Sequence, residues 1–147
     1  MTRNLHSLDA VARVRLVREQ DSLAGLQLAL QEVDSSRQHL STIQMRLTEL
    51  SGQPVSTPEE LVALRQGMLA LGQAANDAQA ALESARTLAT SAHSHWQHDR
   101  IRLRTIEMLQ ERRIEQARAE SIRADAKGHD EMATQLWARR RHLRVVS

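Results

Sequence analysis

The chain has 147 residues, with no Cys, Phe or Tyr, two Trp and a formal net charge of +2. A compact core of this size normally relies on aromatic side chains, which bury about 150–250 Å² each, so this composition argues against a globular domain. The missing thiols exclude disulfides, zinc–thiolate sites and cysteine catalysis. We therefore expect an all-α chain in which aliphatic side chains and alanine fill the narrow seams between a few long helices.

A first helix is predicted over about residues 3–50. Its apolar residues recur three or four positions apart, the spacing of a coiled-coil seam. Arg37 interrupts this series, and two successive three-residue steps that end at Ile43 predict a stammer, which overwinds a supercoil. The series is Leu23, Leu26, Leu30, Val33, Arg37, Leu40, Ile43, Leu47 and Leu50.

A loop is predicted over residues 51–57, where glycine and proline interrupt the helical pattern. Thr57 is a candidate N-cap, Pro58 occupies the first helical position, and Glu60 follows Thr57 by three residues. This combination is a capping box with proline at a position where no N–H is needed. A second helix should therefore begin at Pro58.

The second helix is predicted over about residues 58–140, with a regular heptad seam whose only polar member is Asp99. Two helices joined by so short a loop run antiparallel, which predicts one elongated coiled-coil hairpin over residues 1–147. The seam positions are Leu61, Leu64, Met68, Leu71, Ala75, Ala78, Leu82, Ala85, Ala89, Ala92, Trp96, Asp99, Leu103 and Ile106.

The pairing of the two helices follows from the position of the loop. A loop centred near Pro54 would place Trp96 opposite Ala12 and bring Asp99 near Arg13 or a neighbouring backbone group. It would also leave the second helix unpaired beyond about residue 106. A single charged helix is marginally stable in water, so we expect this segment to become ordered on binding a partner. Its apolar residues show no steady period: Leu109, Ile114, Ile122, Met132 and Leu136.

No residue pattern predicts catalysis, a cofactor site or a complete metal site. His95 and His98 have a spacing that metals can use, and His93 is nearby, but no thiolate or suitable carboxylate completes the set. We expect these histidines to be exposed beside the seam. The chain also lacks a phosphate-binding loop and a nucleophile–base pair, so we expect that it is not an enzyme.

Charge is unevenly distributed along the chain. Residues 1–99 carry eight Arg and eleven acidic residues, whereas residues 100–147 carry twelve Arg or Lys and seven acidic residues. The cluster over residues 139–144 could contact an acidic protein, nucleic acid or anionic lipid. No run of about 18 apolar residues is present, and the N-terminal residues lack a signal-peptide core, so we expect a cytoplasmic protein without membrane insertion.

Residues 96–133 carry a pattern that resembles the C-terminal half of the FliJ family. Trp96 is followed after five residues by Arg102 and Leu103, and after five more by the run LQER at 109–112. The spacing D-x-K-x-x-D-E-x-A follows at 125–133. This family comprises small coiled-coil proteins of bacterial type III export and includes the YscO and HrpO relatives of virulence injectisomes. Residues 1–90 are similar to the family in architecture only.

The resemblance implies a stalk-like protein that binds the hexameric export ATPase and its regulator, promotes ring assembly and links the ring to the membrane export gate. Some family members also handle export chaperones, and the family implies a peripheral position at the inner-membrane export apparatus. The implied ATPase-binding residues are Leu109, Glu111, Arg112, Asp125, Lys127, Asp130 and Glu131. The implied gate-binding residues are Ile43, Leu47, Leu50 and Leu71.

One departure and two alternatives accompany this resemblance. Flagellar relatives carry aromatic residues near the loop end, and this chain has none there, which favours a divergent or injectisome member. A self-associating structural coiled coil without an ATPase partner is the first alternative. A nucleic-acid-binding hairpin that uses the arginine-rich C-terminal end is the second, although we expect protein partners and no nucleic acid.

Overall fold

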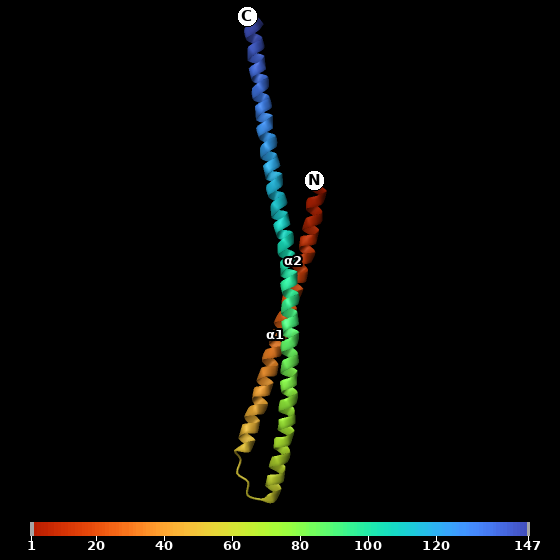
Figure 1. Cartoon of the computed structure of the whole chain (residues 1–147), viewed down its shortest axis with the longest axis vertical. Helices are drawn as coiled ribbons and strands as arrows, with labels where there is room; N and C mark the ends of the chain where they lie inside the picture. Colours follow the sequence, from red (N-terminus) through yellow and green to blue (C-terminus); the bar gives the residue numbers. More distant parts are fainter. Residues whose placement is uncertain (1, 147) are drawn as a thin grey trace. The chain divides into compact units, whose positions relative to one another are not determined.

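The computed structural model describes the backbone of residues 2–146 and the side chains of residues 6–146. Two helices, α1 (Thr2–Ser51) and α2 (Pro58–Val146), make up the described chain, and no strand occurs in it (Figure 1). The predicted all-α class is confirmed. Contacts divide the chain into two units, Arg13–Leu103 and residues 1–12 with 104–147. We call the first the hairpin unit and the second the terminal unit.

The start of α2 is fixed by a capping box. The Glu60 amide donates a hydrogen bond of 3.2 Å to Thr57 Oγ1, and the Ser56 amide donates one of 2.9 Å to Glu60 Oε2. The side chain of Glu60 therefore reaches back one residue further than the usual box geometry. Glu59 and Glu60 also place negative charge at the positive end of the helix dipole. These contacts explain why the helix begins at Pro58.

The core of the hairpin unit pairs large side chains of α1 with small side chains of α2. Val33, Leu40 and Ile43 of α1 are buried against a row of α2 residues. Because most of that row is alanine, the two backbones can approach closely. The α2 members are Ala78, Leu82, Ala85 and Ala89. Within the predicted seam, Leu61 and Met68 near the loop are exposed.

The seam of α1 alternates steps of three and four residues without a stammer. Leu30 is 50% exposed and Arg37 is exposed, so the predicted seam was wrong at these two positions. Ala29 and Ser36 occupy the seam in their place. Small and polar side chains can face a bulky side chain of α2 there. They were not predicted because the seam was assigned from the spacing of large apolar residues. Beside the seam, Leu23 is also half-buried. The seam itself is the buried or half-buried series Arg15, Glu19, Ser22, Leu26, Ala29, Val33, Ser36, Leu40, Ile43, Leu47 and Leu50.

The pairing of the helices in the hairpin unit differs from the prediction by several residues. Trp96 Nε1 donates a hydrogen bond of 2.9 Å to Glu19 Oε1, so Trp96 lies opposite Glu19 and not opposite Ala12. Near the loop, a Cβ added to Gly67 would lie 3.2 Å from Leu50 Cδ2. Residue 50 of α1 therefore meets residue 67 of α2, well inside the second helix.

The loop explains this shift. Gln53, Pro54 and Val55 line a shallow groove with Glu60 and with Ala63 and Leu64, so the loop runs beside the first turns of α2. Figure 1 shows the loop continuing past the end of α1 to reach the start of α2. An extended residue spans about 3.3 Å and a helical residue about 1.5 Å, so a few loop residues bypass two helical turns.

In the terminal unit, the N-terminal part of α1 packs on α2 beyond the predicted limit of about residue 106. Gln110 Nε2 donates a hydrogen bond of 2.8 Å to Asp9 Oδ1, and Leu8 is buried. Ile106, Gln110 and Arg113 are half-buried, and every residue from 114 to 146 is exposed. Pairing therefore continues through polar contacts after the apolar series stops, and the unpaired part of α2 begins after Arg113.

Candidate functional site

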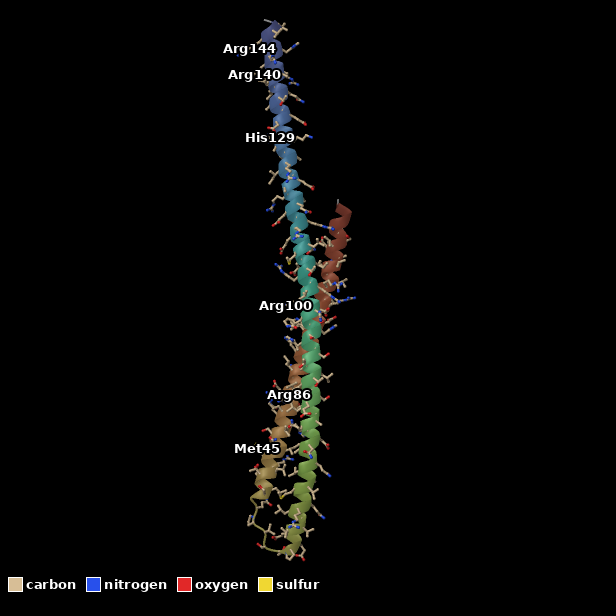
Figure 2. The ribbon with its side chains drawn as sticks, in the orientation of Figure 1. Met45, Arg86, Arg100, His129, Arg140 and Arg144 are labelled. Carbon is tan, nitrogen blue, oxygen red and sulfur yellow. The ribbon has the colours of Figure 1, made fainter. Side chains whose placement is uncertain are left out.

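The part of α2 in which every residue is exposed is 114–146, which we call the overhang. The helix is continuous to Val146. Figure 2 shows side chains projecting to both sides of this segment in the view, and it labels His129, Arg140 and Arg144. The overhang therefore offers a whole helical surface to a partner.

One face of the overhang is enriched in apolar residues. At about 100° of rotation per residue, five of its large aliphatic side chains fall within an arc of about 80°, whereas Val145 and Val146 lie outside it. These residues show no period in the sequence because several of them are eight or ten apart, which is not a simple heptad, and because the neighbouring Leu109 lies outside this arc. All five are more than half exposed: Ile114, Ile122, Met132, Leu136 and Leu143.

The predicted ATPase-binding residues are all exposed, but they do not share one face. By the same helical geometry, Glu111 and Asp125 lie on the apolar side. Glu111 Oε1 is also 3.4 Å from Arg104 Nη1 within the terminal unit. The other five lie within an arc of about 100° on a different side. They are Leu109, Arg112, Lys127, Asp130 and Glu131.

The basic cluster near the C-terminus includes an aromatic contact. The Arg141 guanidinium carbon lies 5.2 Å from the centroid of the Trp137 ring, within the range of a cation–π interaction. Trp137 remains exposed despite this contact. The end of the overhang therefore presents an indole next to guanidinium groups, a combination that suits contact with an acidic surface.

The predicted gate-binding residues lie inside the hairpin near the loop. Ile43 is 6% exposed and belongs to the buried core, and Leu47 and Leu71 pack against it. Leu50 is half-buried near Gly67. A partner could reach only the edges of Leu47, Leu50 and Leu71. The apolar surface at this end consists of other residues: Met45, Val55, Leu61, Val62, Met68 and Leu69.

Asp99 is the one charged residue that is buried among the described residues. Ser22 donates a hydrogen bond to Asp99 Oδ2, and His95 Nε2 lies 3.5 Å from the same oxygen. Ser22 and His95 thus take the place expected for Arg13. The hydrogen bond from Ser22 and the charges of His95, Arg102 and Arg18 outweigh the effect of burial and lower the pKa of Asp99. The carboxylate is therefore held in its charged form.

The three histidines have separate surroundings. His93 packs beside Trp96 with 5.9 Å between ring centroids, and His95 contacts Asp99. His98 is exposed. Within residues 6–146, no three His, Asp or Glu side chains come close enough together to hold a metal ion. The structure therefore distributes these histidines along the helix surface and does not gather them.

Comparison with known families decides the identity of the chain. The family model described as "Flagellar FliJ protein" matches residues 4–142. This chain belongs to the FliJ family. No curated protein and no solved structure gave a match. FliJ-family proteins are structural components of the flagellar and type III export apparatus and act at its cytoplasmic side, so this chain is an export component.

Neither of the two described helices contains a stretch that is long enough and apolar enough to cross a membrane. Sequence reasoning located the FliJ-like segment at 96–133, and the family match extends over both helices. The feature that sequence reasoning missed is the apolar face of the overhang. Projecting the sequence onto a continuous helix of 3.6 residues per turn would have revealed that face.

Proposed function

We propose that this FliJ-family protein is a stalk-like coiled coil that binds the hexameric export ATPase through its overhang. In this role it promotes assembly of the ATPase ring and links the ring to the export gate. The observation that carries the proposal is the overhang itself, a fully exposed helix with five aliphatic side chains on one face. An unpaired helix is marginal in water, and a partner surface would stabilise it by covering this face.

Apolar and charged residues have separate roles in this proposal. Ile122, Met132 and Leu136 anchor the overhang against apolar surface of the ATPase ring. Glu111 and Asp125 lie on the same side as these residues. On the other side, the charged residues Arg112, Lys127, Asp130 and Glu131 form ion pairs with the ring, and Leu109 adds an apolar contact. Exposed ion pairs contribute on the order of 0.2–1 kcal/mol each, so they select the orientation more than they determine the affinity. The ATPase regulator and export chaperones are further partners that the family suggests.

We place the gate contact at the loop end of the hairpin, with a refined assignment of residues. Ile43 is buried, so its role is to hold the two helices together. Leu47, Leu50 and Leu71 offer their edges, and exposed neighbours such as Met45 and Leu69 complete the surface. Figure 2 shows Met45 on α1 near the loop. The two contacts would give the protein a peripheral position at the inner-membrane export apparatus.

The test mixes the purified chain with the export ATPase from the same genome and follows ATP hydrolysis and ring assembly. The wild-type chain should stimulate both, and a truncation after Arg113 should not. The double variant Ile122→Asp/Leu136→Asp should also lose stimulation, because it places charge on the apolar face. Ala117→Asp/Gln135→Asp adds the same charge between the two faces and is the matched control.

Three results would change the proposal. Equal stimulation by the wild-type chain and the truncation would move the ATPase contact onto the paired helices. Equal loss in the test and control variants would show that charge alone, and not the apolar face, matters. Absence of stimulation and of ring binding by the wild-type chain would contradict an ATPase role. Light scattering would then test self-association of the chain.

A further inference from the structure

One flank of the hairpin unit combines a row of leucines with a row of basic residues. On α1, Leu16, Leu23 and Leu30 are seven residues apart, and on α2 Arg86, His93 and Arg100 are also seven apart. Seven residues are nearly two helical turns, so each row follows one side of its helix. Leu16 is 42% exposed, Leu30 is 50% exposed and Leu23 is half-buried. The three α2 residues are exposed.

The two rows border a common groove. Leu26 and Leu30 of α1 line it together with Ala89, Thr90 and His93 of α2. Because the helices are antiparallel, a step of seven residues back along α1 corresponds to seven residues forward along α2. Leu23 and Leu16 therefore continue one border of the groove in the direction in which Arg100 continues the other.

Trp96 joins the two rows further along the same flank. Its ring lies between two members of the basic row, with 5.9 Å to the His93 ring centroid and 5.2 Å to the Arg100 guanidinium carbon. Its Nε1 donates to Glu19 Oε1, so the nearby carboxylate already has a partner. The flank is therefore apolar on one border and positively charged on the other, with an indole between them.

We propose that this flank binds an amphipathic α-helix of a partner protein that has an apolar stripe with an acidic edge. The apolar stripe would pack on the leucine row, and the acidic edge would lie along Arg86 and Arg100. The segment 22–31 of α1 contains no charged residue, so no acidic side chain of α1 would oppose that edge there. The heptad spacing of both rows matches the repeat of a third helix in a coiled-coil bundle.

Charge argues against a second copy of this chain as the occupant. If two such flanks met in antiparallel orientation, Arg86 of one copy would face Arg100 of the other. In parallel orientation, a two-fold axis along the helices would place the basic row of each copy on the leucine row of the other. The first arrangement opposes like charges, and the second covers guanidinium groups with apolar side chains, so both disfavour association. A bilayer is also a poor fit, because the apolar surface lies in a groove between two helices, whereas a membrane-binding helix presents a convex apolar face.

This flank shares no residue with the surfaces assigned to the ATPase or the gate, so the proposal is independent of the proposed function. The experiment uses the full chain with Trp137→Phe, which leaves Trp96 as the one tryptophan. Two tryptophan-free helical peptides of equal length are titrated, both with Leu at the a and d positions. One carries Glu at e and g, and the other carries Lys. The readout is Trp96 fluorescence.

The Glu peptide should cause a saturable change in Trp96 fluorescence and bind at least about tenfold more tightly than the Lys peptide, since the basic row attracts one and repels the other. Arg86→Glu/Arg100→Glu should reverse this preference. Leu30→Asn should weaken binding of the Glu peptide. Leu88→Asn is the matched control, because Leu88 is 63% exposed on α2 and is not among the groove residues. Circular dichroism verifies that each variant keeps its helical content.

Several results would overturn the proposal. These are no binding of either peptide, equal affinity for both peptides, or equal loss of binding in Leu30→Asn and Leu88→Asn. Failure of the double arginine variant to reverse the preference would also overturn it. Vesicles of anionic phospholipid serve as a further probe. Binding of the wild-type chain to these vesicles, without binding to the Glu peptide, would make a membrane surface the occupant and contradict a protein helix.

Discussion

Along α2, the hairpin unit and the overhang use aliphatic residues in different ways. In the hairpin unit, Ala78, Leu82 and Ala85 are buried against α1. In the overhang, Ile122, Met132 and Leu136 are exposed, although they too lie on one face of the helix. The buried face is rich in alanine, which allows a second helix to approach closely. The exposed face has large aliphatic side chains, with Asp125 among them and no alanine.

An apolar face on a helix is therefore not sufficient evidence that its side chains are buried within the same chain. The hairpin unit has a second strip of matching residues within the same chain, and the overhang does not. Large apolar side chains on one face are typical of helices that fit into the groove of another protein. The comparison therefore separates residues that maintain the fold from residues that are available to a partner.

Leu82→Ala should give the largest loss of stability. Leu82 is 3% exposed, the lowest value in the core, so its truncation leaves a cavity in the seam. We expect the free energy of unfolding to fall by about 2–5 kcal/mol. Leu136→Ala in the overhang should change it by less than about 0.5 kcal/mol. Urea unfolding followed by circular dichroism measures both, and similar losses would show that the overhang is buried in solution.

Ala85→Leu should destabilise the hairpin through overpacking. Ala85 is buried where α2 approaches α1, and three extra heavy atoms would force the helices apart. The expected cost is about 1–3 kcal/mol. Ala80→Leu introduces the same side chain on the exposed side of α2 and is the control. Thermal unfolding of each variant measures the effect. A melting temperature of Ala85→Leu equal to that of the wild-type chain would argue against close contact of the helices at this residue.

Asp99→Asn should change how stability depends on pH. The pKa of Asp99 is lowered in the folded chain, mainly by the hydrogen bond from Ser22. A carboxyl group with a lowered folded pKa stabilises the fold above its ordinary pKa, and this stabilisation disappears as the pH falls through the folded value. The difference between the wild-type chain and Asp99→Asn should thus be largest near pH 7 and shrink below about pH 4. Asp77→Asn is the matched control for urea unfolding at both pH values.

Gly25→Ala and Gly128→Ala should have the smallest effects on stability. One lies in the hairpin unit and the other in the overhang, so the pair allows a direct comparison of the two regions. A Cβ at either position meets no atom within 4 Å, so alanine should favour the helix by up to about 1 kcal/mol. At Gly25 the gain should appear in global unfolding. At Gly128 it should appear as slower amide hydrogen exchange in the overhang alone. A gain in global stability from Gly128→Ala would mean that the overhang unfolds together with the hairpin.

The sequence predicted the class of fold and much of the α2 seam, because heptad spacing and capping are local properties. Ala78, Leu82, Ala85 and Ala89 were assigned to the seam and are buried in it. The α1 seam was predicted less well. Ser22 and Ser36 were overlooked because polar side chains leave no apolar signal, and Leu30 was included because it is a leucine at helical spacing. The apolar face of the overhang required a continuous helix before its residues could be seen to align.

By itself, the sequence determined that the chain forms long helices around one loop and carries a FliJ-like segment over residues 96–133. Only the tertiary structure decided which residues of α1 face which residues of α2. The extended loop bypasses the first turns of α2, and this shift pairs Trp96 with Glu19 and Asp99 with Ser22. It also moves the end of pairing to Arg113. The physical reason is that a heptad pattern fixes which side of a helix is buried, but every shift of seven residues preserves that pattern, so specific contacts must select among them.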